Sequence, residues 1–169
     1  ARNPPYGEWT AGFARVAVMA TLSLLAVGGL VTSHDAGLAV ADWPNSFGYN
    51  MFLYPLSRMT GGIYYEHAHR LFGALVGLTT IVLAIRLWKR DARKWVHRLA
   101  LAAVVLVVLQ GTLGGLRVTG NFTLSTSEVD MAPSIALALA HGVLGQIFLG
   151  VMVALAAVTS VRWLEAGAP

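Results

Sequence analysis

Two histidines stand inside long apolar stretches and share a local pattern. His69 opens the segment His-Arg-Leu-Phe-Gly73, and His141 opens His-Gly-Val-Leu-Gly145. An imidazole within a membrane span is costly unless it is paired or ligated. A glycine four residues later lies on the same helix face and leaves room beside the ring. The repeated pattern favours ligation over the alternative, in which the histidines only hydrogen-bond between closely packed helices.

Heme iron is the metal that this pair favours. Two histidines from facing helices are a common way for a helical bundle to hold heme. The sequence contains no cysteine, and nothing clearly supplies the third or fourth ligand that zinc requires. We therefore predict that His69 and His141 ligate the iron of a bound heme. A surface metal site made by His34, Asp35 and His67 is a lesser alternative.

A carboxylate and an arginine flank the first histidine. Glu66 lies three residues before His69 on the same helix face, and Arg70 follows Glu66 by four residues. Glu66 could act as a base or stabilise developing positive charge, or it could simply pair with Arg70. His67 lies about 200° from His69 around the helix, so both cannot reach one ligand. We expect His67 at the outer surface or behind the site.

Three further polar residues could contact a cofactor. Gln110 stands among aliphatic residues, where it could bond a propionate, a ligand imidazole or a neighbouring helix; the helix is favoured. Arg117 and Arg58 are expected on the outer side, where a guanidinium suits a carboxylate or propionate but also serves as an ordinary interface charge. The predicted cofactor-binding residues are His69, His141, Arg70, Gln110 and Arg117.

The composition requires that lipid surround the elements carrying these residues. Hydrophobic residues make up 56% of the chain and charged residues only 12%, and the mean hydropathy is +0.64. A membrane-spanning helix needs about 20 apolar residues. We predict one all-α membrane domain, residues 1–169, with four spans at about 13–32, 66–88, 99–116 and 133–161.

The basic residues sort by membrane side. All except Arg58, Arg70 and Arg117 lie in the segment 86–98 or flank the ends of the first and fourth spans. The positive-inside bias therefore places segment 86–98 and both termini in the cytoplasm. The segments 33–65 and 119–132 then face outward. This distribution of basic residues explains the net charge of +4, so we predict no nucleic-acid partner. We expect the bacterial plasma (inner) membrane, because the topology is regular and no transit peptide is present.

A short internal repeat divides the chain into two hairpins. The first span ends in Gly28-Gly-Leu-Val-Thr-Ser33 and the third in Gly114-Gly-Leu-Arg-Val-Thr119. Each is followed by an outer segment and then by a helix with the histidine pattern. The repeat predicts two helical hairpins related by a pseudo-twofold axis along the membrane normal, with the two histidines facing one another.

The order of the motifs resembles that of the heme A synthase family. The matching motifs are Gly28-Gly-Leu-Val-Thr32, Gly37, Asp42-Trp-Pro44, Glu66-x-x-His69-Arg70, Gln110-Gly-Thr-Leu-Gly-Gly115 and His141. The resemblance implies an oxidoreductase that converts the C8 methyl of heme O to a formyl group, giving heme A for terminal oxidases. It implies that His69 and His141 flank the iron and that Glu66 is the catalytic carboxylate. The segment around Asp42-Trp-Pro44 would close over the site.

The sequence also departs from the family pattern. Family members usually have eight spans in two similar halves, of which one resembles a substrate site and the other a heme b site. This chain matches only the amino-terminal half, and it lacks the cysteine pair found in the outer loop of some members. A lone half would form a homodimer, join a partner membrane subunit, or be a fragment. The alternatives are a non-catalytic heme b electron-transfer or accessory subunit of a respiratory complex, and a purely structural subunit.

Overall fold

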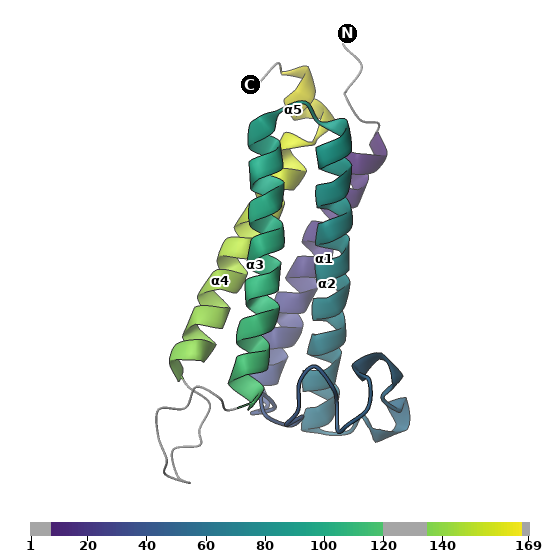
Figure 1. The fold of residues 1–169 in the computed structure, drawn as a ribbon, viewed down its shortest axis with the longest axis vertical. Coiled ribbons are helices and arrows are strands. Elements are labelled where there is room, and N and C mark those ends of the chain that lie inside the picture. Colours follow the sequence, from purple (N-terminus) through teal and green to yellow (C-terminus); the bar gives the residue numbers. More distant parts are fainter. Residues whose placement is uncertain (1–7, 120–134, 167–169) are drawn as a thin grey trace.

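Four long helices and one short helix make up the protein. The computed structural model describes residues 8–119 and 135–166 (Figure 1). The helices are α1 (Glu8–Ser33), α2 (Gly62–Arg90), α3 (Lys94–Thr119), α4 (Ile135–Val158) and α5 (Val161–Glu165). Four are long and apolar enough to cross a membrane, and no strand occurs in the described ranges. The predicted all-α membrane architecture is therefore confirmed. Most of the predicted outer segment 119–132 and the start of the fourth span at 133 lie outside the described residues.

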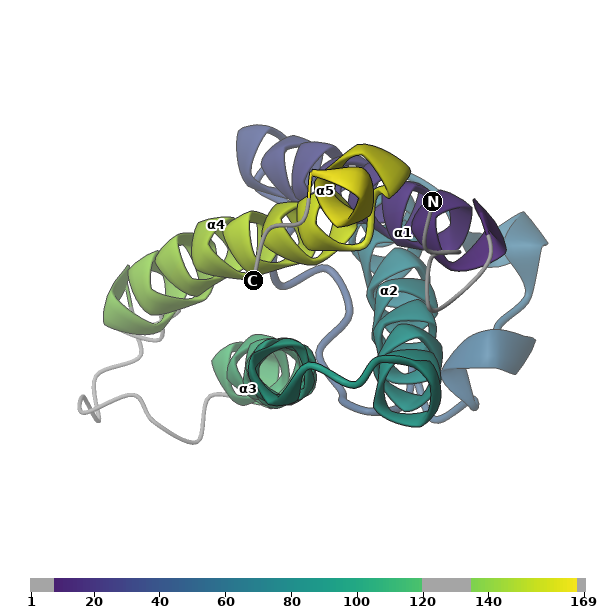
Figure 2. The ribbon, with the colours of Figure 1, turned by 90° about the horizontal axis from the view of Figure 1, so that it is seen from above.

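The long helices form two antiparallel hairpins that pack side by side. Helix α1 packs against α2 and α4, and α3 packs against the same two helices, so the four stand at the corners of a quadrilateral (Figure 2). The start of α1 and the end of α4 lie at one end, together with the turn between α2 and α3 (Figure 1). We call this the inner end, and the opposite end the outer end. That the inner end faces the cytoplasm is still a prediction from the charge distribution.

The apolar core fills the inner half of the bundle. Small residues on α1 and α3 meet large residues on α2 and α4, which lets the side chains of neighbouring helices interdigitate. The buried core residues are Ala14, Ala17, Val76, Leu83, Leu87, Val96, Ala100, Ala103, Phe148, Met152, Leu155 and Val158. Because this core lies toward the inner end, the two histidines of α2 and α4 are left to the outer half.

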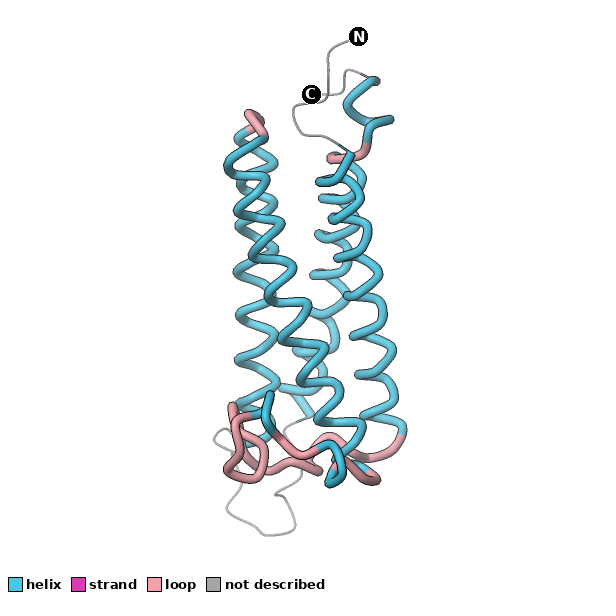
Figure 3. The backbone as a smooth tube through the Cα atoms, turned by 90° about the vertical axis from the view of Figure 1, so that its right-hand side faces the viewer, coloured by secondary structure: helices cyan, strands magenta, loops and turns pink. Residues whose placement is uncertain are grey.

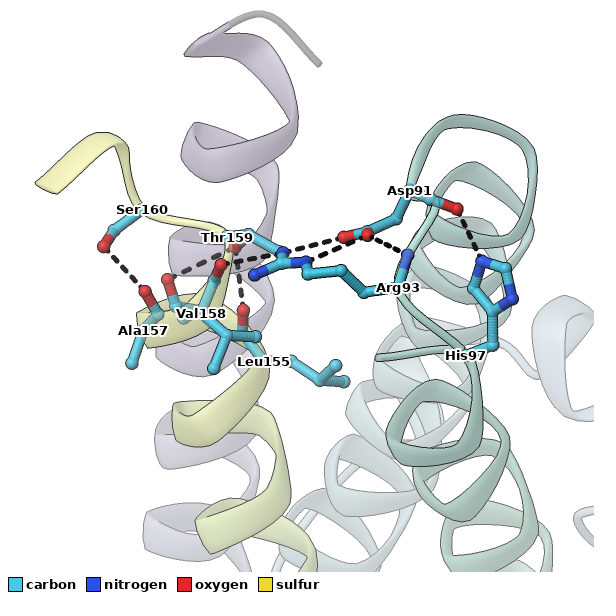
Figure 4. A network of polar contacts seen from close by, with 9 residues as sticks. Asp91, Arg93, His97, Leu155, Ala157, Val158, Thr159 and Ser160 are labelled. Carbon is cyan, nitrogen blue, oxygen red and sulfur yellow. Dashed lines mark hydrogen bonds and ion pairs between the residues drawn. The ribbon is translucent and has the colours of Figure 1, made fainter. Parts of the chain in front are cut away.

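Polar contacts tie the helix ends together at the inner end. The Arg86 guanidinium lies 3.8 Å from the centroid of the Trp9 ring and joins α2 to α1. In the turn after α2, Arg93 donates to Oδ2 of Asp91 (2.8 Å) and to the backbone carbonyl of Val158 on α4 (3.0 Å), as Figure 4 shows. These contacts fix the separation of the two hairpins at the end away from the histidines.

Helix α4 ends before the limit predicted for the fourth span. The span was predicted to reach residue 161, whereas α4 ends at Val158 and α5 begins at Val161. Oγ of Ser160 accepts the N–H of Trp163 (3.3 Å) and so caps α5. A serine in this capping position starts a new helix rather than continuing the old one.

The outer loop, residues 34–61, is folded rather than extended (Figure 3). It contains two short 3-10 helices, η1 (Met51–Leu53) and η2 (Leu56–Arg58). The Asp42 carboxylate accepts the N–H groups of Phe47 (2.7 Å) and Gly48 (2.8 Å) and closes a turn. Partial burial alone would raise the pKa of Asp42, but the Gly48 and Phe47 N–H groups and the Arg70 charge lower it below its usual value. The turn is therefore held by a charged carboxylate.

The outer loop reaches across from the first hairpin to the second. The indole of Trp43 lies directly on Gly115 of α3, where a Cβ atom would overlap the ring. A glycine at this position is what allows the loop to dock so closely. Trp43 itself is 44% exposed, so the contact covers one face of the indole only. The loop thereby joins α2 and α3 at the outer end.

Replacing Gly115 by alanine should undock this part of the loop. The new methyl group would overlap the Trp43 ring, and overpacking of this kind costs about 1–3 kcal/mol. Gly111, one turn earlier on α3, has open space where its Cβ would be and serves as the matched control. We expect Gly115→Ala to lower the thermal unfolding temperature in detergent and shift Trp43 emission, while Gly111→Ala leaves both unchanged or raises the temperature. Equal behaviour of the two variants would contradict the close contact.

Candidate functional site

The structure brings His69 and His141 together in the outer half of the bundle. His69 comes from α2 and His141 from α4, and their ring centroids lie 6.4 Å apart with the ring planes at 76°. Each histidine belongs to a different hairpin. The repeated sequence pattern thus produces a facing pair.

Each imidazole rests against a glycine of the preceding helix. A Cβ atom at Gly28 of α1 would lie 3.0 Å from Cε1 of His69, and one at Gly114 of α3 would lie 3.5 Å from Cε1 of His141. Gly28 and Gly114 are the equivalent glycines of the internal repeat. The repeat therefore places a glycine next to each imidazole, and we call Gly28 and Gly114 the glycine seats. A larger residue at either position would displace the imidazole.

The two rings keep unpaired nitrogens in this apolar setting. Nδ1 of His69 and Nδ1 of His141 are both buried, and neither has a hydrogen-bond partner among the described residues. An unsatisfied buried polar group costs about 1–3 kcal/mol, so natural structures rarely keep one without a reason. Two such nitrogens in a facing pair form a site able to ligate a metal.

The glycines that follow the histidines differ in the space they leave. A Cβ at Gly73 would meet nothing within 4 Å, and one at Gly77 would meet only Val107 Cγ2 at 3.9 Å. A Cβ at Gly145 would lie 3.3 Å from Cδ2 of Leu25. There is thus open space beside Gly73, one turn after His69 on α2. At Gly145, one turn after His141, α4 packs closely against α1.

Gln110 makes the interhelical contact that the sequence favoured. Its Nε2 donates to the backbone carbonyl of His141 at 3.0 Å and joins α3 to α4. Because this is the backbone carbonyl of His141, Gln110 fixes the position of the α4 backbone at that histidine. Contact between Gln110 and a cofactor stays a prediction.

Glu66 is buried and engaged at both carboxylate oxygens. Its exposure is 4%; Oε1 accepts Nη2 of Arg70 at 2.6 Å, and Oε2 accepts the backbone N–H of Val40 at 2.9 Å. Pairing with Arg70 is therefore the role that the structure shows for this carboxylate. If Glu66 is also catalytic, it acts while Arg70 and the Val40 N–H hold its two carboxylate oxygens.

Arg70 holds the outer loop against α2. Besides Glu66, its guanidinium donates to the backbone carbonyls of Val40 (2.7 Å), Asp42 (2.6 Å) and Asn45 (2.9 Å). Charge-assisted bonds of this kind are shorter and stronger than neutral ones. The predicted cofactor-binding residue Arg70 is thus committed to the loop. We call the Glu66–Arg70 pair, with its loop partners, the loop latch.

Arg117 lies at the outer end of α3, one turn beyond the seat of His141. A Cβ at Gly37 of the outer loop would lie 3.0 Å from its Nη2. Its Nε is buried, and no hydrogen bond or ion pair is made by its guanidinium within the described residues. Arg58, the other outer arginine weighed above, instead donates to Oη of Tyr49 at 3.2 Å.

Of the two places expected for His67, the structure excludes the exposed outer surface, while a place behind the site stays a prediction. His67 is 1% exposed, its Nδ1 is hydrogen-bonded to Oγ of Ser46 at 3.0 Å, and its ring packs 5.0 Å from Tyr54. It lies under the outer loop because α2 begins at Gly62, earlier than the predicted span. His34 stacks on Tyr65 at 4.1 Å. No group of three metal-ligating side chains occurs in residues 8–119 and 135–166, so the alternative surface metal site lacks support.

Sequence reasoning missed the loop residues that complete the site. Val40 and Asn45 bind Arg70 through backbone atoms, which leave no trace in residue type. Ser46, which is hydrogen-bonded to His67, follows Asn45 in a stretch whose sequence predicts only a turn. The one available indication was the density of turn-forming residues between Asp42 and Gly48, which predicted an ordered loop without naming its contacts.

The fold and the site together define a four-span membrane protein with a pair of facing histidines under a latched loop. Residues 11–163 match the COX15-CtaA family of cytochrome oxidase assembly proteins. The heme A synthase of Alkalihalophilus pseudofirmus is 36% identical over 95 residues, covering 55% of this chain and 31% of that protein. The heme A synthase of Shouchella clausii is 33% identical over 126 residues (72% and 39%), and that of Lysinibacillus sphaericus 30% over 125 residues (71% and 38%). This chain belongs to the heme A synthase family.

Family membership fixes some conclusions and leaves others open. It connects the chain with heme A biosynthesis and, with bacterial relatives and four membrane-crossing helices, makes it a multi-pass bacterial membrane protein. It does not favour the alternative of a non-catalytic heme b subunit. The chain spans between about a third and two fifths of the length of the relatives it matches. No solved structure matches it.

Removing the arginine of the loop latch should release the outer loop. Arg70→Gln loses three bonds to loop carbonyls and leaves Glu66 buried without its partner, and each bond to a charged group is worth about 1.5–3 kcal/mol. We expect proteinase K to cleave the outer loop at least about tenfold faster in this variant. Arg58→Gln, which removes an exposed loop arginine, is the control and should cleave at the wild-type rate. Unchanged cleavage of Arg70→Gln would show that the latch does not hold the loop.

Proposed function

We propose that this chain binds heme between His69 and His141 and takes part in the oxidation of the C8 methyl of heme O to a formyl group. The observation that carries the proposal is the facing pair of buried imidazoles, each with an unpartnered nitrogen. Membership of the heme A synthase family, which connects the chain with heme A biosynthesis, supports the proposed reaction. We further propose that the complete activity needs a second four-helix unit, supplied by another copy of the chain, by a partner membrane subunit or by further sequence of the same protein.

The geometry of the pair suits a single iron atom. If both imidazoles bound one metal ion at nitrogen–metal distances of about 2 Å, their ring centroids would lie no more than about 6 Å apart. The observed centroid distance is 6.4 Å. The glycine seats at Gly28 and Gly114 hold both rings at this separation, and the space beside Gly73 suits a flat ring system. His69 and His141 would thus be the residues that hold heme b, heme O or heme A.

The chain's own residues supply position, charge and protection from water. Heme iron, when bound, supplies the oxidation chemistry. Glu66 stands one turn from His69 on α2 and carries a negative charge that can stabilise positive charge developing on the substrate or accept a proton at Oε2. Arg70 and the Val40 N–H fix both carboxylate oxygens, so the carboxylate does not have to reorganise. The latched outer loop limits the access of bulk water at the outer end.

Heme binding by the pair is tested on the detergent-purified full chain. We expect a reduced-minus-oxidised absorption spectrum typical of low-spin heme, at one heme per chain, and its loss in His69→Ala and in His141→Ala. His34→Ala changes an exposed histidine of the outer loop and should keep the spectrum. Extraction and chromatography of the pigment identify the heme. Colourless wild-type protein that cannot be reconstituted with heme would overturn the proposal.

The role of Glu66 is tested separately from heme binding. Glu66→Gln keeps the side-chain shape and a hydrogen-bonding oxygen, but it removes the negative charge. In membranes that convert heme O, we expect this variant to retain bound heme and to lose conversion by about a hundredfold or more, the usual range for a group that moves protons or stabilises charge. Conversion at the wild-type rate would assign Glu66 to the loop latch alone.

A further inference from the structure

The outer end of the bundle holds one arginine without a partner among the described residues. Of the outer arginines, Arg70 donates to Glu66 and to three loop carbonyls, and Arg58 donates to Tyr49. Arg117 makes no hydrogen bond or ion pair in residues 8–119 and 135–166, and its Nε is buried. A guanidinium that has lost part of its hydration without gaining an acceptor is poised to bind an anion.

The position of Arg117 connects it with the histidine pair. Gly114, which seats the ring of His141, precedes Arg117 by three residues, so both lie on the same face of α3. Arg117 is the next side chain toward the outer end on that face. A ligand held by His141 and extending toward the outer end would therefore pass beside this guanidinium.

The outer loop restricts where the guanidinium can go. A Cβ at Gly37 would lie 3.0 Å from Nη2, 3.3 Å from Cζ and 3.3 Å from Nη1 of Arg117. Gly37 therefore lies close against the guanidinium, and a larger residue there would crowd it. Because the loop is latched to α2 by Arg70, the guanidinium is held in one place rather than free to move. A fixed planar donor suits a carboxylate, which it can bind through two parallel bonds.

We propose that Arg117 binds a carboxylate of the porphyrin held by His69 and His141. This inference rests on the proposed function and adds an orientation: the carboxylate-bearing edge of the macrocycle faces the outer end, and the apolar edge faces the bundle interior or lipid. Arg117 is thus a positioning residue, since it fixes which substituents lie near Glu66 without touching the iron. Gly37 is part of the same subsite because it sets the place of the guanidinium.

The test compares two hemes that differ only in charge. Heme b carries two free propionates, whereas its dimethyl ester has the same iron and ring but no negative charge. Both are titrated into the heme-free, detergent-solubilised full chain, and the dissociation constants are read from the Soret absorbance. For Arg117→Gln, we expect the affinity for heme b to fall about ten- to a hundredfold and the affinity for the diester to stay the same. Arg117→Lys should recover part of the loss.

Two further variants keep the outcome interpretable. Arg58→Gln removes another outer arginine and should bind both hemes like the wild type. Gly37→Ala, which crowds the guanidinium without removing it, should weaken heme b but not the diester. Equal affinities of Arg117→Gln and wild type for heme b, or equal losses for heme b and the diester, would overturn the Arg117 subsite while leaving the histidine pair intact. Failure of the wild-type protein to bind either heme would instead overturn the proposed function.

Discussion

The cost of leaving imidazole nitrogens unsatisfied in an apolar interior governs the arrangement of this protein. His69 and His141 face each other at 6.4 Å, each with a buried and unpartnered Nδ1 among the described residues. Each such nitrogen costs about 1–3 kcal/mol, and lipid around the bundle offers no water to offset that cost. The inner half is packed with apolar side chains, and the two histidines lie in the outer half. The heme that we propose between the two rings would satisfy both nitrogens.

The outer loop depends on the same region. Glu66 and Arg70 lie one turn apart on α2, on either side of His69 in the sequence, and they bind the loop through its backbone. The loop then reaches α3, where Trp43 rests on Gly115 and Gly37 rests on Arg117. The latch on α2 and the glycine contact on α3 together place a folded loop across the outer end of both hairpins. The carboxylate that the family resemblance marks as catalytic is thus also a structural part of this closure.

The parts of the site that follow helical periodicity were predictable, and those made by the loop backbone were not. The facing histidines follow from a pattern repeated in two hairpins, and the Glu66–Arg70 pair follows from a spacing of four residues. The sequence did not decide whether His67 is exposed or buried, because its burial depends on contacts with Ser46 and Tyr54 of the folded outer loop. From the sequence, Arg117 was one of several arginines that could bind a propionate. The structure distinguishes it, because Arg58 and Arg70 have partners within the protein.

Electron paramagnetic resonance of the ferric protein tests most directly whether both imidazoles ligate one iron. The purified full chain, reconstituted with heme b, should give a low-spin ferric signal that accounts for all of the bound heme, because two imidazoles make a strong axial field. His69→Ala and His141→Ala should each convert the remaining heme to the high-spin form. A high-spin signal in the wild type, or a low-spin signal that survives both substitutions, would contradict the account and place the heme elsewhere.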